Sequence, residues 1–148
     1  MTSPGAARLG HRDHSREAER NPEEALFYFR LRLAYEVDPG AVYRERAERR
    51  DRYVLVDARS ASDYRRAHLP GALNIPSASA LLSTLGDLVP GKAIVCYGET
   101  DARSDALSIA AALSAAGREA AVMRGGLRAW LAEGFPVEQG GKSSAGEW

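Results

Sequence analysis

The chain is poor in the residues that hold metals and disulfides. It has one cysteine, Cys96, and three histidines among 148 residues. A single cysteine excludes an internal disulfide framework and fits a reducing compartment. One cysteine with three scattered histidines gives no metal-ligand spacing either, so we expect no metal and no cofactor.

The chain also lacks an excess of charge and a long apolar run. Twenty basic and twenty acidic residues give a formal net charge of zero, which favours neither nucleic acid nor an anionic membrane as a partner. No apolar stretch is long enough to cross a bilayer, and the N-terminus has no apolar h-region of a signal peptide. We therefore expect a soluble, cytoplasmic α/β protein with one domain, whose partner is a small molecule.

Residues 94–104 are the most informative stretch of the chain, because they combine a predicted strand, a polar loop and the start of a helix. Ile94 to Tyr97 form a brief apolar run, typical of a strand covered on both faces. From Ser104, an N-cap candidate, apolar residues recur with helical spacing. The loop from Gly98 to Arg103 should therefore lie over a helix N-terminus, where free N–H groups favour an anion. An active site is expected in this loop.

Four segments follow one another along the chain. Residues 1–20 are predicted to be a flexible tail, and residues 21–50 a helical extension that begins at Asn21-Pro22. Residues 51–138 form the main domain, and residues 139–148 a C-terminal tail. In the extension, the stripe Phe27-Tyr28-Phe29 is expected to pack on the sheet, with a pocket wall or a homodimer face as alternatives.

Short apolar runs alternate with helical patterns in the main domain. We expect strands at 53–56, 94–97 and 120–123, an extended segment at 73–76, and helices at 60–67, 77–85, 104–116 and 127–132. This alternation predicts a mostly parallel sheet with helices on both faces. Because ligands of such folds bind beyond the carboxyl ends of the strands, Asp57 and Arg59 should lie near the loop.

Four ordered segments carry a family resemblance. They are residues 54–59 (Val-Leu-Val-Asp-Ala-Arg), residues 68–72 (His-Leu-Pro-Gly-Ala), the strand and loop at 94–104, and residues 123–130 (Met-Arg-Gly-Gly-Leu-Arg-Ala-Trp). In this order and spacing they resemble the rhodanese (sulfurtransferase) family, in its bacterial single-domain type. The resemblance implies a rhodanese-like parallel five-stranded sheet flanked by helices. It also implies a loop cysteine that carries sulfane sulfur as a persulfide.

The loop departs from that family's pattern of a strand, a Tyr, the catalytic Cys and a later Arg-Ser. Laid on Tyr97 and Arg103 without a gap, the pattern has Gly98 at the position of the catalytic cysteine. Cys96 falls two residues earlier, inside the strand, and Arg103 stands where the subgroup often has a second cysteine. A buried cysteine is usually inert, so we expect a structural role for Cys96. A related phosphatase is disfavoured, because six residues rather than five separate Cys96 from Arg103.

The polar residues of the loop are the remaining candidates. Glu99 and Asp101 are candidate catalytic acids or bases, and Arg103 is a candidate clamp for an anion. Alternatively, the two acids stabilise the helix N-terminus and Arg103 pairs with one of them. The predicted loop and pocket also include Gly98, Thr100, Ala102, Ser104, Asp57, Arg59 and His68. Structural roles are favoured for His68 and for an Asp57–Arg59 pair.

Three functions stay open. In the first and favoured one, the thiol chemistry is lost and a closed, polar loop pocket binds or transforms a non-sulfur small molecule through Glu99, Asp101 and Arg103. In the second, Cys96 serves an active sulfurtransferase in a shifted loop. In the third, the chain is a non-catalytic interaction module. Whether the protein is an enzyme is therefore left undecided at this point.

Overall fold

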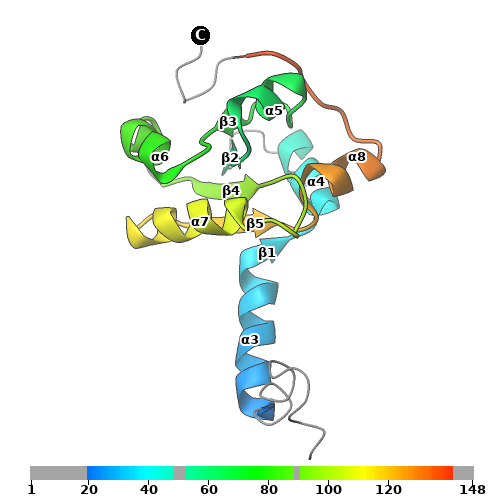
Figure 1. Ribbon diagram of the computed structural model, residues 1–148. Helices are drawn as coiled ribbons and strands as arrows, with labels where there is room; N and C mark the ends of the chain where they lie inside the picture. The colour runs from blue at the N-terminus through cyan, green and yellow to red at the C-terminus, as the bar shows by residue number, and fades with distance from the viewer. Residues whose placement is uncertain (1–19, 49–52, 89–90, 142–148) are drawn as a thin grey trace, which may run out of the picture. The chain divides into compact units, whose positions relative to one another are not determined.

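The computed structural model describes residues 20–48, 53–88 and 91–141 (Figure 1). The predicted tails fall largely outside these residues. The chain divides into two compact units, residues 1–34 and 35–148, and each is described by itself. None of the helices in the described parts is long and apolar enough to span a membrane.

Helix α3, Pro22–Tyr35, makes up most of the described part of the first unit. It begins as expected, because the Asn21 side chain accepts a hydrogen bond from the Glu23 N–H at 2.8 Å. None of its residues is buried. Phe27, Tyr28 and Phe29 are each more than half exposed.

The second unit contains a five-stranded sheet with the order β1-β5-β4-β2-β3, in which every pair is parallel. The strands are β1 (Glu36–Val37), β2 (Tyr53–Asp57), β3 (Leu73–Asn74), β4 (Ala93–Tyr97) and β5 (Ala120–Met123). The four segments expected from the sequence are confirmed. The sequence pattern missed β1, since a two-residue edge strand is too short to show a period.

Helices cover both faces of this sheet (Figure 1). They are α4 (Pro39–Glu48), α5 (Ala61–Arg66), α6 (Ala78–Thr84), α7 (Asp105–Ala115) and α8 (Gly126–Ala132), with a 3₁₀ turn at Leu85–Asp87. Residues of α4, α5 and α8 form one apolar cluster with the sheet, and residues of α6 and α7 form the other. Serines begin two of the helices as N-caps, with Ser60 accepting from the Asp63 N–H and Ser77 from the Ala80 N–H.

The parallel register brings the candidate residues to one edge of the sheet. Asp57 ends β2 opposite Tyr97, which ends β4. The loop after Tyr97 leads into α7, as the sequence predicts. The carboxyl ends of β2 and β4 therefore lie together at the candidate site.

Candidate functional site

A buried ion pair lies beneath the loop. Asp57 and Arg59 are 0% and 5% exposed, and the Arg59 guanidinium donates to both carboxylate oxygens, at 3.0 Å from Nε and 2.7 Å from Nη2. The Tyr97 hydroxyl donates to Asp57 Oδ2 at 2.7 Å and accepts the Leu69 N–H. Burial, and the Asp57 carboxylate beside it, raise the pKa of Tyr97, so this hydroxyl stays protonated. The expected pairing of Asp57 with Arg59 is therefore observed.

Glu99 connects this ion pair to helix α8. Its carboxylate accepts from Arg59 Nη1 at 3.1 Å and from Arg128 Nε at 2.9 Å. Partial burial by itself would raise the pKa of Glu99, but the hydrogen bonds and charges of Arg128 and Arg59 outweigh it and lower the pKa. Glu99 is therefore an ionised bridge between two arginines at neutral pH.

The loop is also held against the turn that begins α8. The Gly98 and Glu99 carbonyls accept the N–H groups of Leu127 and Arg128, and Asp101 Oδ1 accepts the Gly125 N–H at 2.8 Å. Gly126 fits this contact because it has no side chain. A Cβ there would lie 2.5 Å from the Gly98 oxygen, at a φ of +61°. The absence of a side chain at Gly126 therefore permits close packing against the loop.

Cys96 lies within β4, one residue before Tyr97, and belongs to the apolar cluster on the other face of the sheet. It is 0% exposed and packs in the apolar cluster of α6 and α7. Burial raises the pKa of its thiol to about 12. A thiol at this depth with this pKa has almost no thiolate at neutral pH, and the thiolate is the nucleophilic form.

The other loop residues take mixed positions. Arg103 is 67% exposed and pairs with Asp105 at 3.0 Å, so its partner is neither Glu99 nor Asp101, the pairing given above as an alternative to an anion clamp. Thr100 accepts the Ala102 N–H through its hydroxyl at 3.1 Å. Ser104 stands at the N-cap of α7, but its side chain makes no capping hydrogen bond. Each of the contacts of Arg103 and Thr100 is thus with a residue two positions further along the chain.

Position 98 faces the start of α7. A Cβ built on Gly98 would meet the Ala106 N and the Thr100 O at 3.9 Å each, which is ordinary van der Waals contact. A side chain at this position therefore has room, and it would lie near a backbone N–H of the first turn of α7.

The His68 side chain is buried and has stacking and hydrogen-bonding partners. Its ring stacks on Tyr64 with centroids 3.8 Å apart, and its Nδ1 lies 2.7 Å from the Tyr64 carbonyl. His68 also forms an isolated antiparallel bridge with Glu138. This bridge ties the segment after α8 to the segment that precedes β3.

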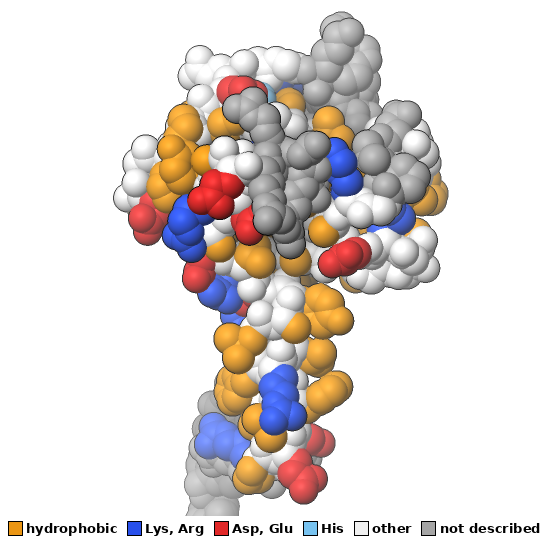
Figure 2. Space-filling model, turned by 180° about the vertical axis from the view of Figure 1, so that it is seen from behind, with side chains coloured by type: hydrophobic (Ala, Val, Ile, Leu, Met, Phe, Trp, Pro, Cys, Tyr) orange, Lys and Arg blue, Asp and Glu red, His pale blue; other side chains and the backbone are white. Residues whose placement is uncertain are grey.

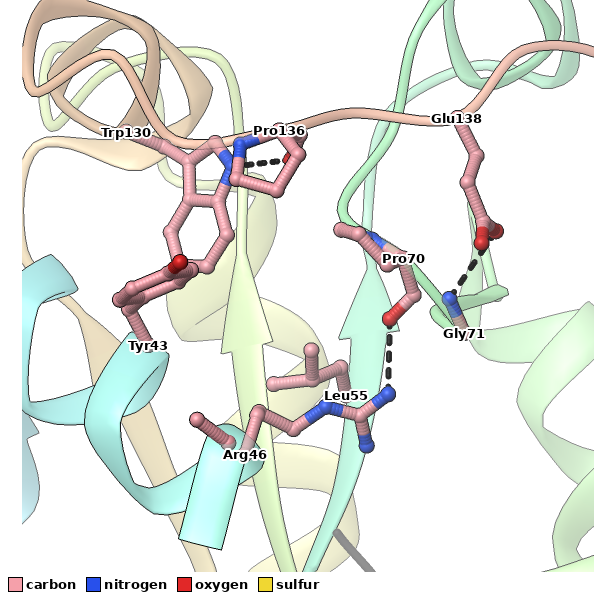
Figure 3. A pocket seen from close by; sticks show the side chains of 9 residues that line it. Tyr43, Arg46, Leu55, Pro70, Gly71, Trp130, Pro136 and Glu138 are labelled. Atoms are coloured by element: carbon pink, nitrogen blue, oxygen red, sulfur yellow. Dashed lines mark hydrogen bonds between the residues drawn. The ribbon is translucent and has the colours of Figure 1, made fainter.

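A cavity of about 370 Å³ lies away from the loop, on the side of the sheet covered by α4 and α8 (Figure 3). Figure 3 shows Tyr43 and Trp130 on one wall, Leu55 at the base, and Arg46 and Glu138 beside the Pro70-Gly71 turn. Its lining residues are Tyr43, Arg46, Ala47, Leu55, Pro70, Gly71, Trp130, Pro136 and Glu138. No pattern in the sequence indicates this cavity, because its walls come from separate segments of the chain.

The polar groups of this cavity are positioned by the backbone. Arg46 Nη2 donates to the Pro70 carbonyl at 2.8 Å, and Glu138 Oε1 accepts the Gly71 N–H at 3.1 Å. The Trp130 indole donates to the Pro136 carbonyl, which orients its ring. The cavity thus has an aromatic wall, a cation and an anion in fixed places.

Residues 41–133, which include the sheet edge and the loop, match the family model described as Rhodanese-like domain. A curated relative, the HTH-type transcriptional regulator Rv0324 of Mycobacterium tuberculosis, is 35% identical over 97 residues, which cover 64% of this chain and 41% of that protein. The chain thus spans less than half the length of this relative.

Two solved structures have the same architecture. The BH2092 protein from Bacillus halodurans is 28% identical, with a TM-score of 0.72 over 80% of this chain and 87% of the other. The rhodanese-like domain of the Alr3790 protein from Anabaena is also 28% identical, with a TM-score of 0.59 over 70% of this chain and 78% of that one.

Proposed function

Because this chain belongs to the rhodanese-like domain family, we propose that it keeps the family's fold without sulfur transfer and acts as a binding module for a non-sulfur small molecule. The observation that carries the proposal is the state of its one cysteine. Cys96 is fully buried within β4, and its pKa is raised to about 12. A persulfide carrier needs an accessible thiolate, which this position does not provide.

The loop position implied by the family resemblance supports the same proposal. Gly98 is where the resemblance places the nucleophile, and a side chain there would have room beside the first turn of α7. A thiolate at that point would gain from the backbone N–H groups and the dipole of the helix. In this account the missing side chain at position 98 removes the chemistry.

A gain-of-function variant tests this account. Gly98→Cys should acquire one sulfur atom from thiosulfate and pass it to cyanide, whereas the wild type should do neither. Thr100→Cys, in the same loop, is the matched control and should stay inactive. Sulfur transfer by the wild type that disappears in Cys96→Ser would contradict the proposal and assign the chemistry to Cys96.

The geometry favours a structural role for the loop carboxylates over the catalytic role that the sequence suggested. Glu99 is held by Arg59 and Arg128, and Asp101 is held by the Gly125 N–H. A general acid needs a raised pKa, and that of Glu99 is lowered. We therefore propose that Glu99 and Asp101 keep the loop closed on α8, and that Arg103 does not take part in catalysis.

The cavity beside α4 is the better candidate for a small-molecule site. Its aromatic wall suits a flat apolar group, and the Arg46 guanidinium on its rim suits an anionic substituent. The relative from Mycobacterium tuberculosis is named a transcriptional regulator. A module that binds without reacting is what a regulator needs from such a domain, and this agreement supports the proposal.

Binding of 8-anilinonaphthalene-1-sulfonate, a flat anionic probe, tests the cavity. The chain has two tryptophans, so a Trp148→Phe background leaves Trp130 as the reporter, and energy transfer from Trp130 should saturate at one probe per chain. Ala47→Phe should narrow the cavity and weaken binding roughly tenfold. Ala111→Phe, on the exposed side of α7, is the matched control. Equal effects of the two substitutions would contradict the assignment.

A further inference from the structure

Helix α3 exposes an unusual number of large apolar side chains. Over 14 residues it has four aromatic residues and three leucines, each at least 40% exposed: Leu26, Phe27, Tyr28, Phe29, Leu31, Leu33 and Tyr35. Figure 2 shows hydrophobic side chains along both edges of this helix. A helix that is apolar on more than one side is normally covered by another element.

The apolar residues form two stripes on opposite sides of the helix. At 3.6 residues per turn, Tyr28, Leu31 and Tyr35 share one side, which we call the tyrosine stripe. Leu26, Phe29 and Leu33 share the other side, with the same spacing of three and four residues. The two stripes differ in the charged residues that lie beside them.

The tyrosine stripe carries opposite charges on the two sides of Tyr28. Glu24 lies one turn before Tyr28, and Arg32 lies one turn after it. Arg32 also lies on this side of the helix, since its Nη1 is 3.3 Å from the Tyr28 hydroxyl and its guanidinium is 5.7 Å from the Tyr28 ring centroid. The stripe is therefore acidic before its central tyrosine and basic after it.

When two copies of the tyrosine stripe lie antiparallel, the acidic end of each faces the basic end of the other. We propose that a second copy of this chain binds the tyrosine stripe, with the two α3 helices antiparallel and Tyr28 at the two-fold axis. Glu24 of each copy then lies opposite Arg32 of the other, so the contact forms twice. The opposite stripe has no such match, because reversing it about Phe29 brings the two Arg30 side chains close together.

The size of the stripe sets the expected affinity. Tyr28 and Tyr35 are 52% and 57% exposed, and a wholly buried aromatic side chain removes about 150–250 Å² from water. With Leu31, the stripe offers on the order of 300 Å² per copy, which is below the roughly 800 Å² per partner of a standard interface. The dimer should therefore be reversible, with a dissociation constant in the micromolar range. The zero net charge of the chain imposes no general repulsion between copies.

Sedimentation equilibrium of the full chain tests the surface. The wild type should be a concentration-dependent dimer, and Tyr28→Glu should be a monomer. Leu26→Glu is the matched control on the opposite stripe, since Leu26 and Tyr28 are 51% and 52% exposed, and it should dimerise like the wild type. A wild type that stays monomeric at roughly 100 μM, or equal weakening by both variants, would overturn the proposal.

Charge reversal tests the antiparallel direction. Residues 24 and 32 are eight positions apart, about 12 Å along one helix, so they cannot pair within a copy. Glu24→Arg and Arg32→Glu should each weaken the dimer roughly tenfold, because each removes both ion pairs between the copies, and the double variant should restore it. Far-ultraviolet circular dichroism should show equal helix content in all three. A parallel pair would be insensitive to the reversals, and a double variant as weak as the singles would exclude the antiparallel contact.

Discussion

The reactivity of Cys96 gives the sharpest quantitative prediction. Iodoacetamide reacts with the thiolate, and burial raises the pKa of Cys96 to about 12. At pH 8 a thiol with that pKa is ionised in roughly one molecule in 10,000, against about one in four for an ordinary cysteine of pKa about 8.5. Ionisation alone should therefore slow alkylation about a thousandfold.

Burial protects Cys96 by a second route. Because its side chain is 0% exposed, reagent reaches it after local or global opening. An opening free energy of about 5 kcal/mol would leave roughly one chain in 5,000 accessible at any moment. Either route predicts protection of at least about a thousandfold relative to the unfolded chain.

Intact mass spectrometry over a time course at pH 8 measures this protection. The native chain should stay unmodified while glutathione in the same tube is consumed. The chain in 6–8 M urea, roughly the range that unfolds most domains, should react as fast as glutathione. Native alkylation within tenfold of the glutathione rate would refute the reasoning, because it would place an ionised thiol at the surface.

Three further perturbations test the contacts beneath the loop. Arg59→Met should lower the free energy of unfolding by about 3–5 kcal/mol, because it leaves the Asp57 carboxylate buried without its partner. Urea unfolding measures this, and a loss below about 1 kcal/mol would show that the pair is not buried in solution. Glu99→Gln should cost less than about 1 kcal/mol. Since the folded pKa of Glu99 lies below its usual 4.5, that contribution is present above the unfolded pKa and disappears as the pH falls through the folded pKa. If the difference in unfolding free energy between the wild type and Glu99→Gln grew as the pH fell, it would contradict the lowered pKa of Glu99. Gly126→Ala should destabilise the chain by about 1–3 kcal/mol more than Gly117→Ala. Both glycines have positive φ, but a Cβ at Gly126 would meet loop backbone and one at Gly117 would meet nothing within 4 Å. Equal decreases in the melting temperature of the two variants would show that the loop backbone moves to accommodate the added Cβ.

Much of the fold followed from local patterns in the sequence. Short apolar runs between turn residues predicted four of the five strands, and the helices in the described residues were placed close to their observed bounds. The burial of Cys96 followed from its place within an apolar run. These features are decided by residues close together in the chain, which is why pattern reasoning could find them.

Local sequence patterns did not predict most of the contacts that define the site. The Tyr97 hydroxyl reaches Asp57, 40 residues away, because the register of β2 and β4 places them side by side. Arg128 reaches Glu99 through the turn at the start of α8. Of the alternatives open for Arg103, neither Glu99 nor Asp101 is its partner, because Arg103 pairs with Asp105 at the start of α7. Which side chains form these pairs depends on the tertiary structure and cannot be predicted from their spacing in the sequence.

The cavity beside α4 illustrates the same limit. Tyr43, Leu55, Trp130 and Glu138 come from separate segments and become neighbours through packing across one face of the sheet. The stacking of Tyr43 on Phe135, with centroids 4.2 Å apart, fixes the aromatic wall. Residues so far apart in the chain line one cavity only after the helices and strands have packed together.

The absence of sulfur transfer is the central claim, and the mass of the native protein after exposure to thiosulfate tests it most directly. The wild type and Cys96→Ser should both keep their original mass, while Gly98→Cys, treated in parallel, should gain one sulfur atom. Gain of one sulfur atom by the wild type, absent in Cys96→Ser, would contradict the account and make Cys96 a persulfide carrier despite its place inside β4.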